Sequence, residues 1–325
     1  MSLPTLLKKY FPLYLKGMAM GAADVVPGVS GGTIAFISGI YQELIDSIHQ
    51  INFGLWKVWK QDGLAACWKQ ANGNFLFFLV AGIATSILSL AKLITYLLHH
   101  HAVLLWSFFF GLILASIWMI YQQTNRWKWQ EMLAFLASTF FAFYLTIMQP
   151  TTSPDSYGFI FLSGFFAIIA MILPGISGAF ILLLLGSYEV IIGSLGSLTP
   201  LIKAQDWEGL AVVISKLAVF GIGAILGLKA FSGVLHWMFA HYKNITLVVL
   251  TGFMVGSLNK IWPWKQVLST RINSKGEEVP FLEKSILPNH YEGDPQIFGA
   301  ILYILIGFLA IFMLEKLAKQ MHKSS

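Results

Sequence analysis

The chain has 325 residues, of which 57% are hydrophobic and only 11% are charged, and its formal net charge is +6. A soluble domain carries about 25% charged residues, so this composition excludes a water-soluble globular protein and makes the bilayer the main solvent. The basic residues stand mostly in loops between apolar runs rather than in one stripe, which argues against a nucleic-acid partner and for orientation signals and membrane-lipid contacts.

The apolar runs form two series along the chain. The first opens with a segment interrupted by Pro and Gly at 12–48, followed by expected spanning helices at 75–98, 103–121 and 131–149. The second opens with a similar segment at 158–195, followed by helices at 211–237, 245–262 and 297–315. Each helical run is close to the ~20 residues that a bilayer requires. A polar loop at 263–296 is long enough to fold over as a small cap.

The two interrupted segments resemble each other. Residues 17–47 align without a gap on residues 164–194, at an offset of 147, and 11 of the 31 positions are identical. We therefore predict an internal duplication, with a first repeat over 1–150 and a second over 151–325. Paired broken segments at matching places in two halves indicate a transporter binding site.

The charge pattern favours re-entrant hairpins over spanning segments. If each broken segment leaves the membrane on the side it entered, each half crosses three times and the second half is inverted. With Lys8 and Lys9 in the cytoplasm, most basic loops and both termini then face the cytoplasm. Spanning segments would place the basic loops 49–74 and 122–130 opposite the N-terminus. The expected fold is thus an all-α polytopic membrane protein of two inverted repeats, each a re-entrant helical hairpin followed by three transmembrane helices.

Each broken segment carries a Pro-Gly-x-Ser-Gly motif. Proline ends the incoming helix, glycine allows a tight reversal, and serine caps the helix that follows. A helix N-terminus inside the membrane is a favourable anion site, although a single such motif is equally well explained as a packing kink. The expected anion-binding residues are Pro27, Gly28, Ser30, Gly31, Gly32 and Thr33 in the first motif, and Pro174, Gly175, Ser177 and Gly178 in the second.

Charged residues in apolar surroundings are functional candidates by default. Asp24 adjoins the first motif, has Met171 as its counterpart, and either carries a coupling proton or holds loop amides by hydrogen bonds. Glu43 and Glu189 follow matched tyrosines and are further coupling candidates, with an interfacial position as the alternative. Lys92 and Lys229 lie inside apolar helices, where they either neutralise a phosphate or extend to an interface.

Several chemistries lack support. Cys67 is the only cysteine, which excludes an intramolecular disulfide and a cysteine-based metal site. The run His99–His101 has no neighbouring carboxylate, so we expect no metal. There is no P-loop and no nucleophile set for hydrolysis, and we expect neither a cofactor nor enzymatic activity.

The stretch Asp24–Thr33, DVVPGVSGGT, and its copy Pro174–Gly178, PGISG, resemble the bacterial membrane family once catalogued as domain of unknown function 368. Members of that family are regarded as polyprenyl-phosphate translocases. The resemblance covers nearly the whole chain. It implies a flippase that returns undecaprenyl phosphate, the lipid carrier of wall precursors, from the outer to the inner leaflet of the bacterial cytoplasmic membrane, with the two motifs at the phosphate.

Two other functions remain open at this point. A secondary transporter of a small soluble anion would use the same hairpins around a closed aqueous pocket. A non-transporting scaffold or channel would show no cavity at the hairpin tips. The coupling ion is undetermined, and a homodimer is left open.

Overall fold

The computed structural model describes residues 3–26, 28–124, 127–150, 156–272 and 278–323. The first seven helices are α1 (Leu3–Val25), α2 (Gly31–Ile37), α3 (Tyr41–Gln50), α4 (Gly54–Gln70), α5 (Gly73–His100), α6 (Ala102–Gln123) and α7 (Trp129–Ile147). The next five are α8 (Tyr157–Ile172), α9 (Gly178–Leu184), α10 (Tyr188–Ala204), α11 (Trp207–His241) and α12 (Lys243–Ser257). Strands β1 (Lys265–Ile272) and β2 (Glu278–Ser285) and the short helix η1 (Pro288–His290) precede α13 (Ile297–Lys323).

Four helices of the described chain, α5, α6, α7 and α11, are long and apolar enough to cross a membrane. The pair α9 and α10 would make a fifth span if taken together, but the two helices meet at 110°. Helices α8 and α12 and the apolar part of α13 are shorter. The protein is therefore a multi-pass membrane protein. The helix expected at 245–262 ends early, at Ser257, because the chain turns there and the Lys260 amide donates to the Ser257 carbonyl at 2.8 Å.

The two duplicated segments fold alike. Helices α2 and α9 have seven residues each, and α3 and α10 both begin at a matched tyrosine, all at the offset of 147. The turns that precede α2 and α9 place Gly28 and Gly175 at φ values of +85° and +93°, where a side chain would be strained. The elements of the two duplicated segments thus follow the same order, and the division of the whole chain into two inverted repeats stays a prediction.

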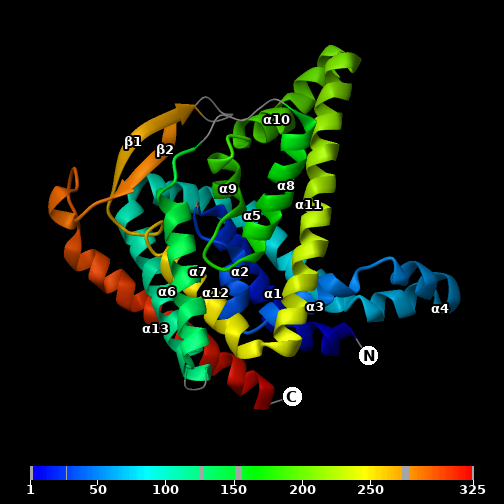
Figure 1. Cartoon of the computed structure of the whole chain (residues 1–325), viewed down its shortest axis with the longest axis horizontal. Coiled ribbons are helices and arrows are strands. Elements are labelled where there is room, and N and C mark those ends of the chain that lie inside the picture. The colour runs from blue at the N-terminus through cyan, green and yellow to red at the C-terminus, as the bar shows by residue number, and fades with distance from the viewer. Residues whose placement is uncertain (1–2, 27, 125–126, 151–155, 273–277, 324–325) are drawn as a thin grey trace.

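Figure 1 shows how the elements are distributed along the molecule. Both chain ends lie at one end of it, on the side where α3 and α4 emerge, and α10 and the β1–β2 hairpin lie at the opposite end. Helix α11 runs between these two ends. The two short hairpins α2–α3 and α9–α10 therefore leave the interior toward opposite ends.

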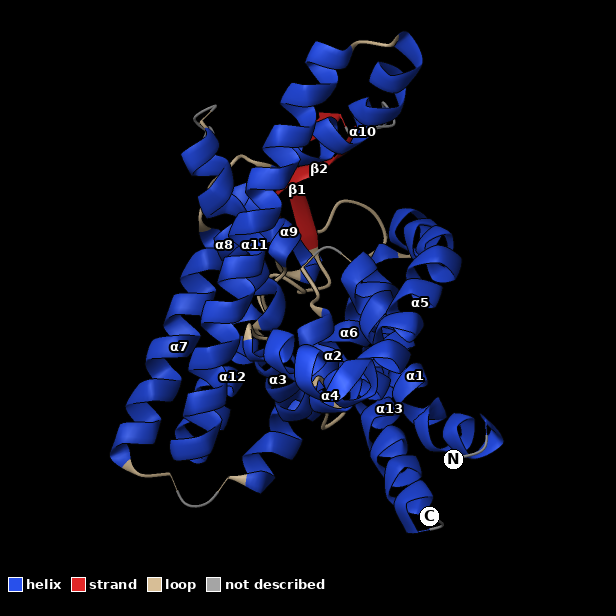
Figure 2. Ribbon diagram, turned by 90° about the vertical axis from the view of Figure 1, so that its right-hand side faces the viewer, coloured by secondary structure: helices blue, strands red, loops and turns tan. Residues whose placement is uncertain are grey.

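Four helix pairs form the body of the fold: α1 with α5, α8 with α11, α6 with α13, and α7 with α12. Figure 2 shows α7 beside α12 and α8 beside α11. Every pair closes through glycines that face a carbonyl oxygen of the partner helix. Examples are Gly17 against Leu79, Gly111 against Ile304, Gly223 against Phe161 and Gly256 against Thr139. Small residues let membrane helices approach closely. The resulting packing contacts stabilise each pair, because there is no hydrophobic driving force between helices inside lipid.

Two segments expected as loops have regular structure. Most of the basic loop 49–74 is helix α4, which breaks at Gly63 and exposes Trp56, Trp59 and Trp68. Figure 1 shows α4 projecting from the helical body, and its Trp and Lys content is typical of a helix lying in a membrane interface. The loop 263–296 contains the antiparallel β1–β2 hairpin, so the expected cap is a small sheet.

The glycine contacts predict a sharp contrast between two neighbouring positions on α11. Gly223→Ala would push a methyl group into the Phe161 carbonyl, whereas Gly221→Ala would place it in open space. We expect Gly223→Ala to lower the thermal unfolding midpoint of the purified protein in detergent. Gly221→Ala should leave the midpoint unchanged or raise it slightly, because alanine favours helix more than glycine does. Equal midpoints for the two variants would contradict close packing of α8 on α11.

Candidate functional site

The two Pro-Gly-x-Ser-Gly turns meet inside the protein. The Ser30 hydroxyl donates to the Met171 carbonyl at 3.0 Å, and the Tyr41 hydroxyl donates to the Ile172 carbonyl at 3.2 Å. In the reverse direction, the Gly175 amide donates to Thr33 Oγ1 at 2.8 Å. The last carbonyls of α8 have no partner within their own helix, and the first hairpin supplies their donors. The backbone groups of the second break are thus satisfied by side chains of the first hairpin.

The first motif is closed by the protein's own groups. Asp24 Oδ1 accepts the Gly31 amide at 2.6 Å, and Ser30 Oγ accepts the Gly32 amide at 3.2 Å. The N-terminus of α2 therefore already carries a carboxylate and a hydroxyl, and the Ser30 hydroxyl is engaged both as donor and as acceptor. This geometry matches the hydrogen-bonding alternative for Asp24. Pro27 lies outside the described residues.

The second motif is arranged differently, although its backbone is similar. Met171 replaces the aspartate, and the Ser177 side chain makes no capping hydrogen bond to α9. Ser177 instead lines a small void of about 10 Å³ together with Gly28, Gly175, Thr146 and Lys260. A void of this size holds about one water molecule. Of the two motif serines, Ser177 is therefore the one whose hydroxyl is not used to cap its helix.

Lys260 is the functional candidate that the sequence pattern missed. It follows the end of α12, and its side chain packs over Gly28, with Cγ 2.9 Å from the point where a Cβ on that glycine would lie. Its ammonium lies 4.8 Å from the centroid of the Phe180 ring. Lys260 thus contacts the turn before α2 and a residue of α9. In the sequence it stands at the end of an apolar run, where lysines commonly extend to a membrane interface. Only the fold distinguishes such an interfacial lysine from one that packs at the hairpin tips.

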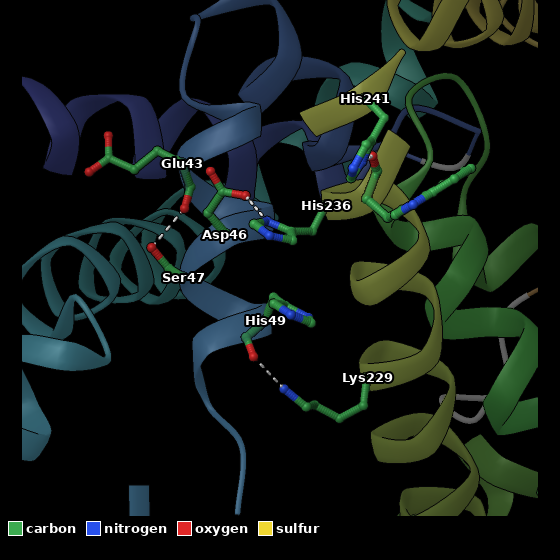
Figure 3. Close-up of polar contacts among 8 residues, drawn as sticks. Glu43, Asp46, Ser47, His49, Lys229, His236 and His241 are labelled. Carbon is green, nitrogen blue, oxygen red and sulfur yellow. Dashed lines mark hydrogen bonds and ion pairs between the residues drawn. The ribbon is translucent and has the colours of Figure 1, made fainter. Parts of the chain in front are cut away.

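The two lysines expected at the phosphate do not line the void at the hairpin tips. Lys92 is exposed on α5. Lys229, on α11, donates to the carbonyls of Ile48 and His49, both at 3.0 Å, so it satisfies the C-terminal end of α3 (Figure 3). A cation at a helix C-terminus is favourable because it complements the helix dipole.

Further polar contacts join α3 to α11 beside Lys229. Asp46 Oδ1 lies 2.6 Å from His236 Nδ1, and the His49 ring stacks on the His236 ring with centroids 4.6 Å apart (Figure 3). Glu43 is exposed in the first turn of α3 and accepts from Asn72 Nδ2 at 3.0 Å. Glu189 is exposed in the first turn of α10. Neither glutamate lines the void at the hairpin tips.

The comparisons with known proteins agree with one another. Residues 20–279 match the family described as undecaprenyl phosphate translocase-like. A Vibrio cholerae protein named polyprenyl-phosphate transporter is 45% identical over 315 residues, which cover 96% of this chain and 98% of that protein. A Staphylococcus aureus protein of the same name is 30% identical over 261 residues, covering 77% of this chain and 85% of that one. No solved structure matches the chain.

The contact between the two turns predicts the effect of one isosteric change. Thr33→Val removes the acceptor of the buried Gly175 amide and should destabilise the protein by about 1–3 kcal/mol, the cost of an unpaired buried group. Thr85→Val is the matched control, because Thr85 bonds only to a carbonyl of its own helix. Thermal unfolding in detergent measures both variants. A Thr33→Val midpoint no lower than that of Thr85→Val would contradict the junction.

Proposed function

Because the chain belongs to the undecaprenyl phosphate translocase-like family, we propose that it transports polyprenyl phosphate. The observation that carries the proposal is the similarity to the Vibrio cholerae polyprenyl-phosphate transporter over nearly the full length of both chains. In the finer form of the proposal, undecaprenyl phosphate moves from the outer to the inner leaflet of the bacterial cytoplasmic membrane and is reused in cell-wall synthesis.

The chemistry of such a lipid suits the hairpin tips. Its phosphate head must cross an apolar layer, which is costly for a charged group without polar partners. Ser177 and Lys260 offer a hydroxyl and a cation at one place. The long tail can stay in the surrounding lipid. The void holds about one water rather than a phosphate, so the head group requires the side chains around it, Lys260 above all, to move aside.

Orientation and coupling complete the proposal. The termini and α4 face the cytoplasm, in line with the positive-inside rule, and the β1–β2 hairpin faces outward. The two halves are inverted repeats whose hairpins enter from opposite sides. Asp24 carries the coupling proton, and Glu43 and Glu189 remain secondary coupling candidates at the two membrane faces.

Asp24→Asn separates proton coupling from helix capping. The asparagine side chain keeps an oxygen that can accept the Gly31 amide, but it cannot ionise. We expect this variant to bind lipid and to lose transport that responds to a proton gradient. The measurement is leaflet exchange of labelled polyprenyl phosphate in proteoliposomes, with and without the gradient. Gradient-driven exchange at the wild-type rate in the Asn variant would assign Asp24 a structural role only.

The same vesicles test the transport proposal itself. Wild-type protein should exchange polyprenyl phosphate and should not accumulate labelled inorganic phosphate. Uptake of inorganic phosphate without lipid exchange would favour a carrier of small soluble anions. Absence of both activities in folded protein would favour a scaffold.

The serines of the two motifs should differ. Ser177→Ala removes a hydroxyl that is not used for capping, so it should weaken lipid binding by about 1–2 kcal/mol. Ser30→Ala removes a hydroxyl bonded to Met171 and Gly32, so it should mainly lower the unfolding midpoint. Binding and unfolding are measured on the same preparations. Equal effects of the two changes on both quantities would contradict the asymmetry between the motifs.

A further inference from the structure

A group of three charged residues connects the hairpin tips with the β1–β2 hairpin. Glu283 on β2 is 3.8 Å from the Lys260 ammonium and 3.7 Å from that of Lys265 on β1. Both ion pairs go to the same oxygen, Oε2. The Lys265 side chain is only 8% exposed, and its ammonium lies 3.3 Å from the centroid of the Trp106 ring on α6.

This group has more positive charge than its own residues neutralise. Two lysines share one carboxylate, and the Lys265 ammonium has no hydrogen-bond partner among the described residues. A buried ammonium without a hydrogen-bonded counterion is costly. The ion-pair distances are also nearly 1 Å longer than the 2.7–2.9 Å of a strong charge-assisted hydrogen bond. Glu283 is therefore a loosely held counterion for two cations.

We propose that Lys260 and Lys265 form a docking site for a phosphate monoester head group, in which Glu283 occupies the place of the ligand until the ligand arrives. The proposal rests on the proposed function and names the residues that first receive the lipid. A phosphate carries about −1.5 to −2 charges near pH 7 and several acceptor oxygens, so it can bond both ammonium groups at once. It neutralises the two lysines fully only when Glu283 withdraws.

Lys260 connects this docking site to the hairpin tips. Its ammonium belongs to the charge group with Glu283, and its aliphatic chain packs over Gly28 beside the void that Ser177 lines. A movement of this one side chain therefore carries a bound head group from the cap toward the junction of the two turns. The same movement enlarges the void, which is too small for a phosphate while Lys260 lies over Gly28.

An apolar hollow adjoins the charges on the side of α6. It measures about 360 Å³ and is lined by Phe110, Leu258, Asn259, Trp262, Ser285, Ile286 and Leu287. Phe110 lies one helical turn from Trp106, and Asn259 and Ser285 lie within two residues of Lys260 and Glu283. The hollow and the charged group are thus formed by neighbouring residues of the same segments. We assign the hollow to the first isoprene units of the same lipid, because only an amphipathic ligand would occupy both the charged group and the apolar hollow.

The protonation state of Lys265 gives the site a pH dependence. Burial lowers the pKa of Lys265 to about 8, with Glu283 opposing the shift and Lys260 adding to it. Lys265 is thus charged below about pH 8 and neutral above it. The second pKa of a phosphate monoester is near 6, so the ligand keeps its charge between pH 7 and 9. Head-group affinity should therefore fall as the pH rises through 8, and this fall should be absent in Lys265→Gln.

The test compares charge variants of the full-length protein in detergent, using binding of undecaprenyl phosphate, undecaprenol and inorganic phosphate. Lys260→Gln and Lys265→Gln should each weaken undecaprenyl phosphate binding by about tenfold or more, the effect of one lost charge-assisted contact. Glu283→Gln should tighten it several-fold, because the competing carboxylate is gone. Lys284→Gln, an exposed neighbour on β2, is the matched control and should bind as the wild type does.

The possible results separate the docking site from the transport proposal. Wild-type binding of undecaprenyl phosphate that none of the charge variants alters would overturn the docking site alone. Glu283→Gln that binds more weakly and unfolds earlier would make Glu283 a structural group, and this too would overturn it. Inorganic phosphate that binds as tightly as the lipid would overturn the lipid assignment. A wild-type protein that binds undecaprenol and undecaprenyl phosphate equally would contradict the proposed function as well.

Discussion

The structure depends on the requirement that every backbone polar group inside a bilayer find a partner within the protein. Helix α8 must end at the second Pro-Gly turn, and its last carbonyls then lack donors. The hydroxyls of Ser30 and Tyr41, more than 130 positions earlier in the chain, supply them, and Thr33 accepts the Gly175 amide in return. This exchange holds the two hairpins together at their tips, and it concentrates polar groups where the rest of the fold is apolar.

The same exchange makes the two motifs unequal. The first motif uses Asp24 and Ser30 to complete its own helix, so it acts as the fixed side of the junction. The second has no aspartate, and Ser177 faces the void beside Lys260. Above Lys260, the β1–β2 hairpin adds a second lysine and one carboxylate. A head group moving inward from the β1–β2 hairpin would contact the two lysines first and Ser177 of the second motif next.

Much of the fold was predictable from the sequence. The features that could not be predicted depend on contacts between residues far apart in the chain. The offset of 147 predicted two similar broken segments, and hydrophobic runs of suitable length predicted the helices. The motifs predicted the tight turns, whereas the serine cap that they also predicted forms at Ser30 and not at Ser177. No local pattern shows that Lys260 reaches Gly28, 232 positions away, or that Lys229 is used by the end of α3. Helix α4 was expected as part of a basic loop because its lysines interrupt every apolar run, but lysines together with three tryptophans also suit an interfacial helix.

We propose that the phosphate of the lipid binds where the two turns meet Lys260. An experimental structure of the protein with bound undecaprenyl phosphate would show the position of that phosphate. We expect phosphate density within hydrogen-bonding distance of the Lys260 ammonium, with either Lys265 or the Ser177 hydroxyl as a second contact and with Glu283 withdrawn from the lysines. Phosphate bound elsewhere, with Lys260 still over Gly28 and Glu283 still between the two lysines, would exclude this binding site.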